Sequence, residues 1–273
     1  MKQTIVLSGL LLLLFFVFAI VNPGEGEKKM DNQKAIYQIM WNADNVEGEV
    51  YINDFAVSSL KGEMGSGSAS LNPWLIGENE VRVELRKADP AQPAKFTFGV
   101  SEVPFGAMVA TTDRGNLFSI DLKDSDFDKA GTARSSRKFK SKLDFSPHLS
   151  GAGEIKESEA VAYAKKLYAL FERRDTDAIL REFAVKIEDY GIVFGQPNFK
   201  AAFKSYLTGD LFKSKLVKIN PAKLRAVSTG PGKKIWHILE GQEEMIRATS
   251  KDGSTSELAI FIGSIKGKLS VIR

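Results

Sequence analysis

The sequence has two histidines, His148 and His237, and histidine is the side chain best suited to acid–base chemistry near neutral pH. His148 lies in a segment rich in proline, glycine and serine. His237 lies in an alternating apolar stretch, which predicts a strand with His237 on its inward face. There it could act as a general base that Asp189 or Tyr190 orients; the alternative is a hydrogen-bonded histidine with a structural role.

Other kinds of chemistry find no support in the sequence. The chain has no cysteine, which excludes disulfides and thiolate chemistry within it. It also has no Gly-x-Ser-x-Gly nucleophile elbow, no Gly-x-x-x-x-Gly-Lys-Ser/Thr phosphate loop and no His-Glu-x-x-His zinc motif. We therefore predict neither a metal nor a cofactor, and a protein without enzymatic activity is the favoured interpretation.

Binding is a second kind of chemistry that the residues allow. Recognition of a carbohydrate would need exposed aromatic platforms beside polar groups, and Trp74 follows Pro73 in a predicted loop. Together with Tyr190 and Trp236, Trp74 forms our set of candidate ligand-binding residues. The alternative is that these aromatic side chains pack in the core.

One segment carries only basic charge. No acidic residue occurs between Lys129 and Lys142. This basic strip could bind anionic lipid headgroups or an acidic partner, but it could equally be a solvated edge strand that lysines protect from pairing. Its candidate residues are Arg134, Arg137, Lys138, Lys140 and Lys142.

The N-terminus predicts export. Residues 5–21 read IVLSGLLLLLFFVFAIV, which as a helix would be about 25 Å long against a hydrocarbon layer of about 30 Å. Residues 1–24 are therefore either a membrane anchor or a cleaved signal peptide, and the polar residues 25–34 form a spacer. The remaining chain would lie on the periplasmic side of the inner membrane if anchored, or would be soluble in the periplasm or secreted if cleaved.

Residues 35–145 predict an all-β domain. Apolar residues alternate in several short runs, such as Val81, Val83 and Leu85, without a helical period between them. We expect a flexible loop over 62–70 and a turn over 77–79. With the landmarks Ile52-Asn53-Asp54 and 75–79, the stretch 50–85 resembles the jelly-roll and immunoglobulin-like accessory sandwiches found beside glycosidase domains.

After a predicted linker over 146–156, residues 157–273 change to an α+β pattern. Two helices separated by a short connection predict a helix hairpin; a short strand over 192–194, a third helix after Pro197 and a run of strands follow. This order resembles the nuclear transport factor 2-like, or SnoaL-like, cone. The resemblance implies a curved antiparallel sheet that wraps the helices and often leaves a pocket.

Three classes of function follow. The first is a non-catalytic envelope protein whose two exported domains bind a protein or polymer. The second is an exported protein that binds a carbohydrate or small ligand, and the third is a cone-fold enzyme that uses His237. The net charge of +4 is mild for 273 residues, and we predict no nucleic-acid partner.

Overall fold

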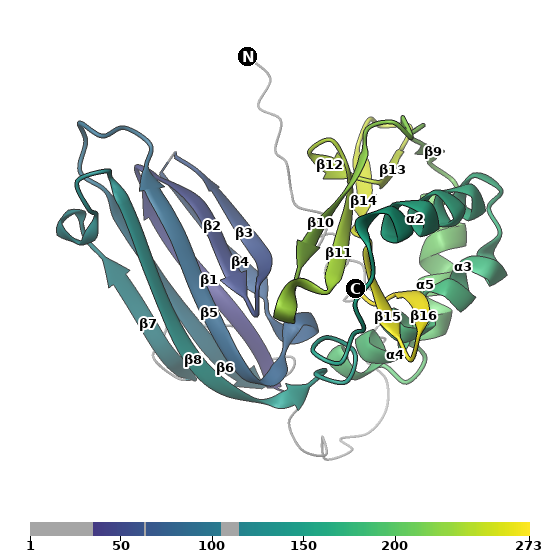
Figure 1. Cartoon of the computed structure of the whole chain (residues 1–273), viewed down its shortest axis with the longest axis horizontal. Coiled ribbons are helices and arrows are strands. Elements are labelled where there is room, and N and C mark those ends of the chain that lie inside the picture. Colours follow the sequence, from purple (N-terminus) through teal and green to yellow (C-terminus); the bar gives the residue numbers. More distant parts are fainter. Residues whose placement is uncertain (1–34, 63, 105–114) are drawn as a thin grey trace. The chain divides into compact units, whose positions relative to one another are not determined.

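The structure, a computed structural model, describes residues 35–62, 64–104 and 115–273 (Figure 1). These residues divide between Ser150 and Gly151 into two compact units, which we call the N-terminal and C-terminal units. The predicted leader and spacer, residues 1–34, lie outside the described residues. Within the described ranges, no helix has the length and apolarity needed to cross a membrane.

The N-terminal unit consists of two antiparallel sheets of four strands each. Their strand orders are β4-β1-β6-β7 and β3-β2-β5-β8, and two single-turn helices, η2 and η3, lie in the connections. The bounds are β1 (Ala35–Asp44), β2 (Val46–Ile52), β3 (Phe55–Lys61), β4 (Gly65–Ser70), η2 (Asn72–Trp74), β5 (Ile76–Lys87), β6 (Lys95–Pro104), β7 (Asn116–Leu122), η3 (Asp124–Asp126) and β8 (Thr132–Asp144).

The alternating apolar residues of these strands form the core between the two sheets. Val81 and Val83 of β5 are fully buried, as the alternation predicts. Tyr37 of β1 joins the sheets, because its ring lies 6.0 Å from that of Phe139 in β8. The Tyr37 hydroxyl also donates to Glu102 of β6 (2.9 Å) and accepts from the backbone N–H of Lys142 in β8 (3.0 Å).

Two predictions in this unit are wrong. The expected loop over 62–70 contains β4, whose Gly67 lies opposite Trp41 and is covered by its indole. The expected turn over 77–79 lies inside β5, where Gly77 has a φ of 76° at a shift in the pairing register with β8. Glycine takes such a conformation without strain, so Gly77 bends the strand and does not end it.

The C-terminal unit combines four helices with short antiparallel strands. The strands form one sheet in the order β10-β11-β15-β16, with β12 beside β11, and a second in the order β14-β13-β9. The bounds are α2 (Glu157–Glu172), α3 (Thr176–Glu182), α4 (Ala184–Val193), α5 (Phe199–Tyr206), η4 (Leu207–Leu211), β9 (Lys215–Leu216), β10 (Leu224–Thr229), η5 (Pro231–Lys233), β11 (Ile235–Glu240), β12 (Glu243–Glu244), β13 (Ile246–Thr249), β14 (Thr255–Leu258), β15 (Phe261–Ile265) and β16 (Lys268–Val271).

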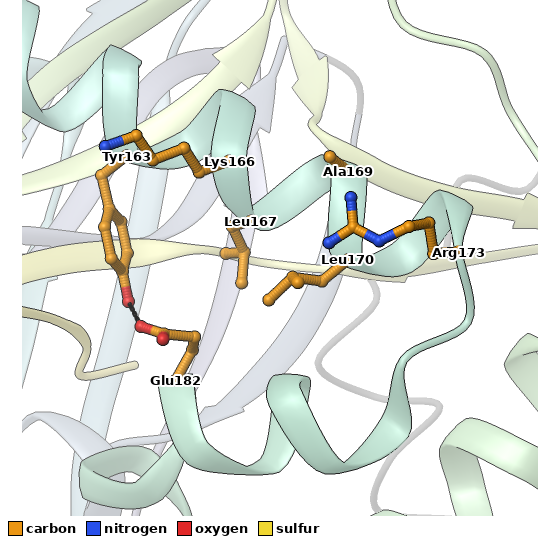
Figure 2. A pocket seen from close by; sticks show the side chains of 7 residues that line it. All are labelled: Tyr163, Lys166, Leu167, Ala169, Leu170, Arg173 and Glu182. Carbon is orange, nitrogen blue, oxygen red and sulfur yellow. Dashed lines mark hydrogen bonds between the residues drawn. The ribbon is translucent and has the colours of Figure 1, made fainter.

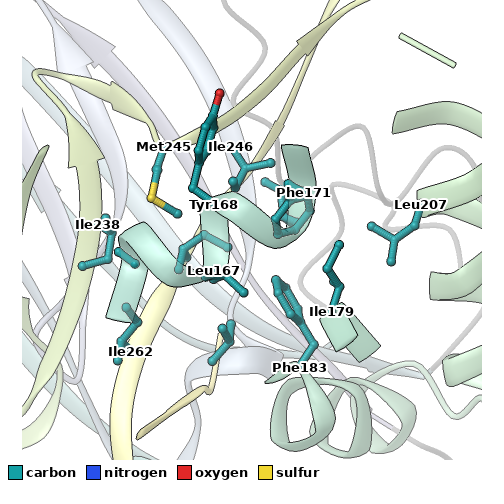
Figure 3. Packing of buried hydrophobic residues seen from close by; sticks show 14 of the residues in the cluster. Leu167, Tyr168, Phe171, Ile179, Phe183, Leu207, Ile238, Met245, Ile246 and Ile262 are labelled. Carbon is teal, nitrogen blue, oxygen red and sulfur yellow. The ribbon is translucent and has the colours of Figure 1, made fainter. Parts of the chain in front are cut away.

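One cluster of buried apolar side chains joins these helices and strands (Figure 3). Phe171 of α2 packs edge-on against Phe183, with ring centroids 6.0 Å apart. Asp175 caps α3 by accepting the N–H of Ala178 (3.0 Å), which fixes the short connection from α2. The labelled members of the cluster are Leu167, Tyr168, Phe171, Ile179, Phe183, Leu207, Ile238, Met245, Ile246 and Ile262.

The order of structure along the chain, β sheets first and helices with further sheets second, confirms the coarse prediction of the fold. The short strand predicted over 192–194 is wrong. Ile192 and Val193 instead complete α4, in which Ile187, Tyr190 and Val193 recur at helical spacing and are buried.

Candidate functional site

A groove between α2 and α3 is a concave feature that the described residues offer to a ligand (Figure 2). It has a volume of about 340 Å³. The floor is apolar, and Tyr163 and Glu182 face each other at one end, where the Tyr163 hydroxyl donates to the Glu182 carboxylate. The lining residues are Tyr163, Lys166, Leu167, Ala169, Leu170, Arg173 and Glu182.

The rim of the groove is basic. Lys166 and Arg173 are exposed, and among the described residues neither makes an ion pair. Glu182 is already engaged by Tyr163, and burial, with the neighbouring Glu182, raises the pKa of the Tyr163 hydroxyl above its ordinary value. The groove can therefore take an apolar side chain on its floor and a carboxylate at its rim.

Sequence reasoning missed this groove. Its residues on α2 repeat at intervals of three and four, so Tyr163, Lys166, Leu167, Leu170 and Arg173 lie along one side of the helix. This side adjoins the buried face that the helical period predicts. One signal in the sequence could have revealed the groove. Leu170 lies at the border of the buried face, and the basic residues Lys166 and Arg173 flank it at helical spacing.

His237 does not meet Asp189 or Tyr190, and the predicted pairing is wrong. The His237 Nε2 lies 3.0 Å from both carboxylate oxygens of Glu244, and its ring stacks on Phe261 with centroids 4.2 Å apart. The reason is the register of β11: Ile238 is fully buried in the core, so His237 lies on the opposite face of the strand.

Asp189 has a different partner. Its carboxylate forms an ion pair and hydrogen bond with the guanidinium of Arg273, and the two side chains are 2% and 0% exposed. Tyr190, next in α4, is buried against Phe194 and Phe199, and burial raises its pKa to about 12. Neither residue is therefore open to a substrate or ligand in this structure.

Lys186 is a buried basic residue that the sequence did not single out. Its Nζ donates to the carbonyl of Ala259 (3.1 Å) and lies over the rings of Phe183 and Tyr190. Burial lowers the pKa of Lys186 to about 7; the charge of Glu244 acts in the opposite direction and that of Arg273 in the same direction. Its position in α4 inside the apolar core supports a structural role.

The two tryptophans proposed as ligand-binding residues are engaged within the protein. Trp74 is only 4% exposed and packs on Phe55 with ring centroids 4.6 Å apart, so its prediction as an exposed platform is wrong. Trp236 is partly buried, packs against the core of the C-terminal unit, and its Nε1 donates to the carbonyl of Ile155 (3.2 Å).

The basic strip lies on β8, at the edge of its sheet, and glutamates of β5 lie opposite its bases. Lys140 forms an ion pair with Glu78 (2.8 Å), and Lys142 pairs with Glu102 of the other sheet (2.6 Å). In the strand register, Arg134 lies opposite Glu84 and Lys138 opposite Glu80. Arg137 lies opposite the buried Val81 and so belongs to the other face of the strand. We use the name charge ladder for these opposed bases and acids: Arg134 and Glu84, Lys138 and Glu80, Lys140 and Glu78, and Lys142 and Glu102.

The described residues contain no group of three or more metal-ligating side chains that could hold a metal ion. Comparison of the chain with protein-family models, with curated proteins and with solved structures finds no match.

Proposed function

We propose that this chain is an exported, non-catalytic protein of the cell envelope that binds a protein or polymer partner through the groove between α2 and α3. In this proposal the N-terminal unit is an accessory β-sandwich, and the C-terminal unit is a cone of the nuclear transport factor 2-like kind. The apolar run at 5–21 supports the export, either as an anchor or as a cleaved signal peptide.

The groove is the single observation that carries the proposal. Leu167 and Leu170 form an apolar floor, and Lys166 and Arg173 extend from its rim without an ion-pair partner among the described residues. The predicted general base and its predicted orienting residue do not line the groove, since His237 binds Glu244 and Asp189 binds Arg273. The partner that fits presents an apolar side chain with a neighbouring carboxylate.

The test is an affinity capture from detergent-solubilised membranes of cells that express the full chain with a C-terminal tag. The double variant Lys166→Glu/Arg173→Glu reverses the charge of the rim, and we expect it to reduce the captured partner by about tenfold. The matched control, Lys165→Glu/Arg174→Glu, makes the same charge changes at the adjacent exposed residues, and we expect capture to persist. Equal capture by both double variants would show that the partner does not bind in the groove.

A small ligand is the second candidate occupant. The volume of about 340 Å³ lies at the lower end of the range of small-molecule sites. In a screen of monocarboxylates with aliphatic or aromatic tails, a ligand of this class should raise the thermal midpoint of the wild type and of the control variant. It should not raise that of Lys166→Glu/Arg173→Glu, and a shift in all three proteins would place the ligand elsewhere.

A further inference from the structure

The four edge strands of the N-terminal unit differ in how they are protected. An edge strand exposes unpaired backbone N–H and C=O groups, and proteins block further pairing there with charges, prolines or bulges. β8 carries the basic strip, and β3 ends in Lys61 and pairs with β2 through a register shift. β7 contains Asp121 and pairs with β6 through a register shift.

β4 has none of these protections. Its sequence, GSGSAS, contains no charged residue and no proline, and its pairing with β1 runs without a register shift. β4 is the terminal strand of its sheet, and its other edge makes no strand pairing among the described residues. Ser66 and Ser68 are exposed, so solvent reaches this strand. Within residues 35–62, 64–104 and 115–273, nothing pairs with this edge, which leaves it available to a further strand.

The side chains at this edge indicate what kind of strand fits. Gly67 and Ala69 share the inward face of β4, because successive residues of a strand point to opposite faces. The indole of Trp41 covers Gly67 so closely that a Cβ there would lie 2.5 Å from the Trp41 Cζ2. Trp41 remains partly exposed, so solvent reaches the aromatic ring that ends the inward face at this edge.

We propose that β4 is a docking edge for an extended segment of a partner polypeptide, which adds to the sheet as a strand beside Gly65–Ser70. Alternate apolar side chains of that segment pack next to Gly67 and Ala69 and against Trp41. A second copy of this chain fits less well, because its β4 offers only glycine and alanine on the inward face to pack against Trp41 and would bury little apolar area. This surface lies in the N-terminal unit and is independent of the groove.

The test uses a defined probe and the full chain in detergent. The probe is a decapeptide of alternating valine and threonine with a lysine at each end, and its control is the same peptide N-methylated at every valine and threonine. Hydrogen–deuterium exchange with mass spectrometry then measures protection of the backbone over 65–70. We expect the first peptide to slow exchange there by about tenfold, and the N-methylated peptide to leave it unchanged.

Variants locate the docking edge. Ala69→Lys places a charge on the inward face of β4, and we expect it to weaken peptide binding by about tenfold. Ser59→Lys places the same charge on the exposed edge strand β3 and should leave binding unchanged; the thermal midpoint of each variant checks its folding.

Unchanged exchange over 65–70 at saturating peptide, or equal effects of the two peptides, would overturn the proposal. If protection of β4 from exchange grows with protein concentration in the absence of peptide, the strand that adds to this edge belongs to a second copy of the chain and the proposed partner is wrong. Because the groove variants leave β4 intact, this test fails or succeeds independently of the proposed function.

Discussion

Asp189 and Arg273, 84 positions apart in the chain, form an ion pair in which both side chains are buried. The pair joins α4 to the residue that follows β16 and Ile272. Removal of one member of such a pair leaves the other charge buried without its counter-charge, which is costly, whereas removal of both members often costs little.

We therefore predict that Asp189→Asn lowers the free energy of unfolding by about 3–5 kcal/mol. The double variant Asp189→Leu/Arg273→Met should be more stable than Asp189→Asn, because no charge remains in the core. Urea unfolding followed by circular dichroism measures both. A double variant whose loss equals the sum of the losses in Asp189→Leu and in Arg273→Met, each measured alone, would show that the two side chains do not act as a pair.

Lys186 should make stability depend on pH. Its pKa is about 7 in the folded chain, against an ordinary value of 10.5 for lysine. Between these values the unfolded chain binds more protons than the folded chain, so the free energy of unfolding rises with pH, by at most about 1.4 kcal/mol per pH unit. Below about pH 7, Lys186 is protonated in both states and its contribution becomes constant.

The corresponding experiment is urea unfolding at several pH values between 7 and 10. Lys186→Met should show a smaller rise of stability with pH than the wild type, because the buried titrating group is gone. Lys165→Met, at an exposed lysine, is the control and should keep the wild-type slope. An unchanged slope in Lys186→Met would assign the pH dependence to other groups.

Phe171 lies at the centre of the C-terminal core (Figure 3). Its side chain is 1% exposed and its ring contacts those of Phe183 and Phe212. Phe171→Ala would leave a cavity among these rings, and we expect it to lower the free energy of unfolding by about 3–5 kcal/mol. Glu172→Ala, at the neighbouring exposed residue, should change the free energy of unfolding by less than about 0.5 kcal/mol. A loss below about 1 kcal/mol for Phe171→Ala would indicate that the core repacks.

The boundary between the units should be the preferred site of limited proteolysis. Ser150 and Gly151 are exposed, whereas Leu149 and Ala152 on either side are buried. We expect a protease of broad specificity to cut first near Ser150, because exposed turns can enter a protease active site and paired strands cannot. Mass spectrometry of the early fragments measures the position. A first cut inside β5 or α2 would contradict two independently folded units.

Alternation and helical period were sufficient to predict the order of β and α+β structure but not every element. Val81 and Val83 reveal β5 because their side chains alternate, whereas β4 contains only glycine, serine and alanine and gives no apolar signal. Ile192 belongs to α4 although a short apolar run is equally typical of a strand.

The candidate site was harder to predict, since its residues meet through the tertiary fold. The partner of Asp189 lies at the far end of the sequence, and His237 turns away from α4 because Ile238 occupies the inward face of β11. Spacing within one segment does not reveal such contacts. The burial of Trp74, in η2, likewise depends on Phe55, which lies on β3.

The charge ladder weakens the electrostatic field that the basic side chains of β8 produce at a distance from the N-terminal unit. Opposite charges a few ångströms apart cancel each other's field beyond about one Debye length, near 10 Å in 0.1 M salt. An anionic membrane or polymer approaching β8 would therefore experience less long-range attraction than the basic sequence there suggests. To bind Lys140, it would first have to displace Glu78.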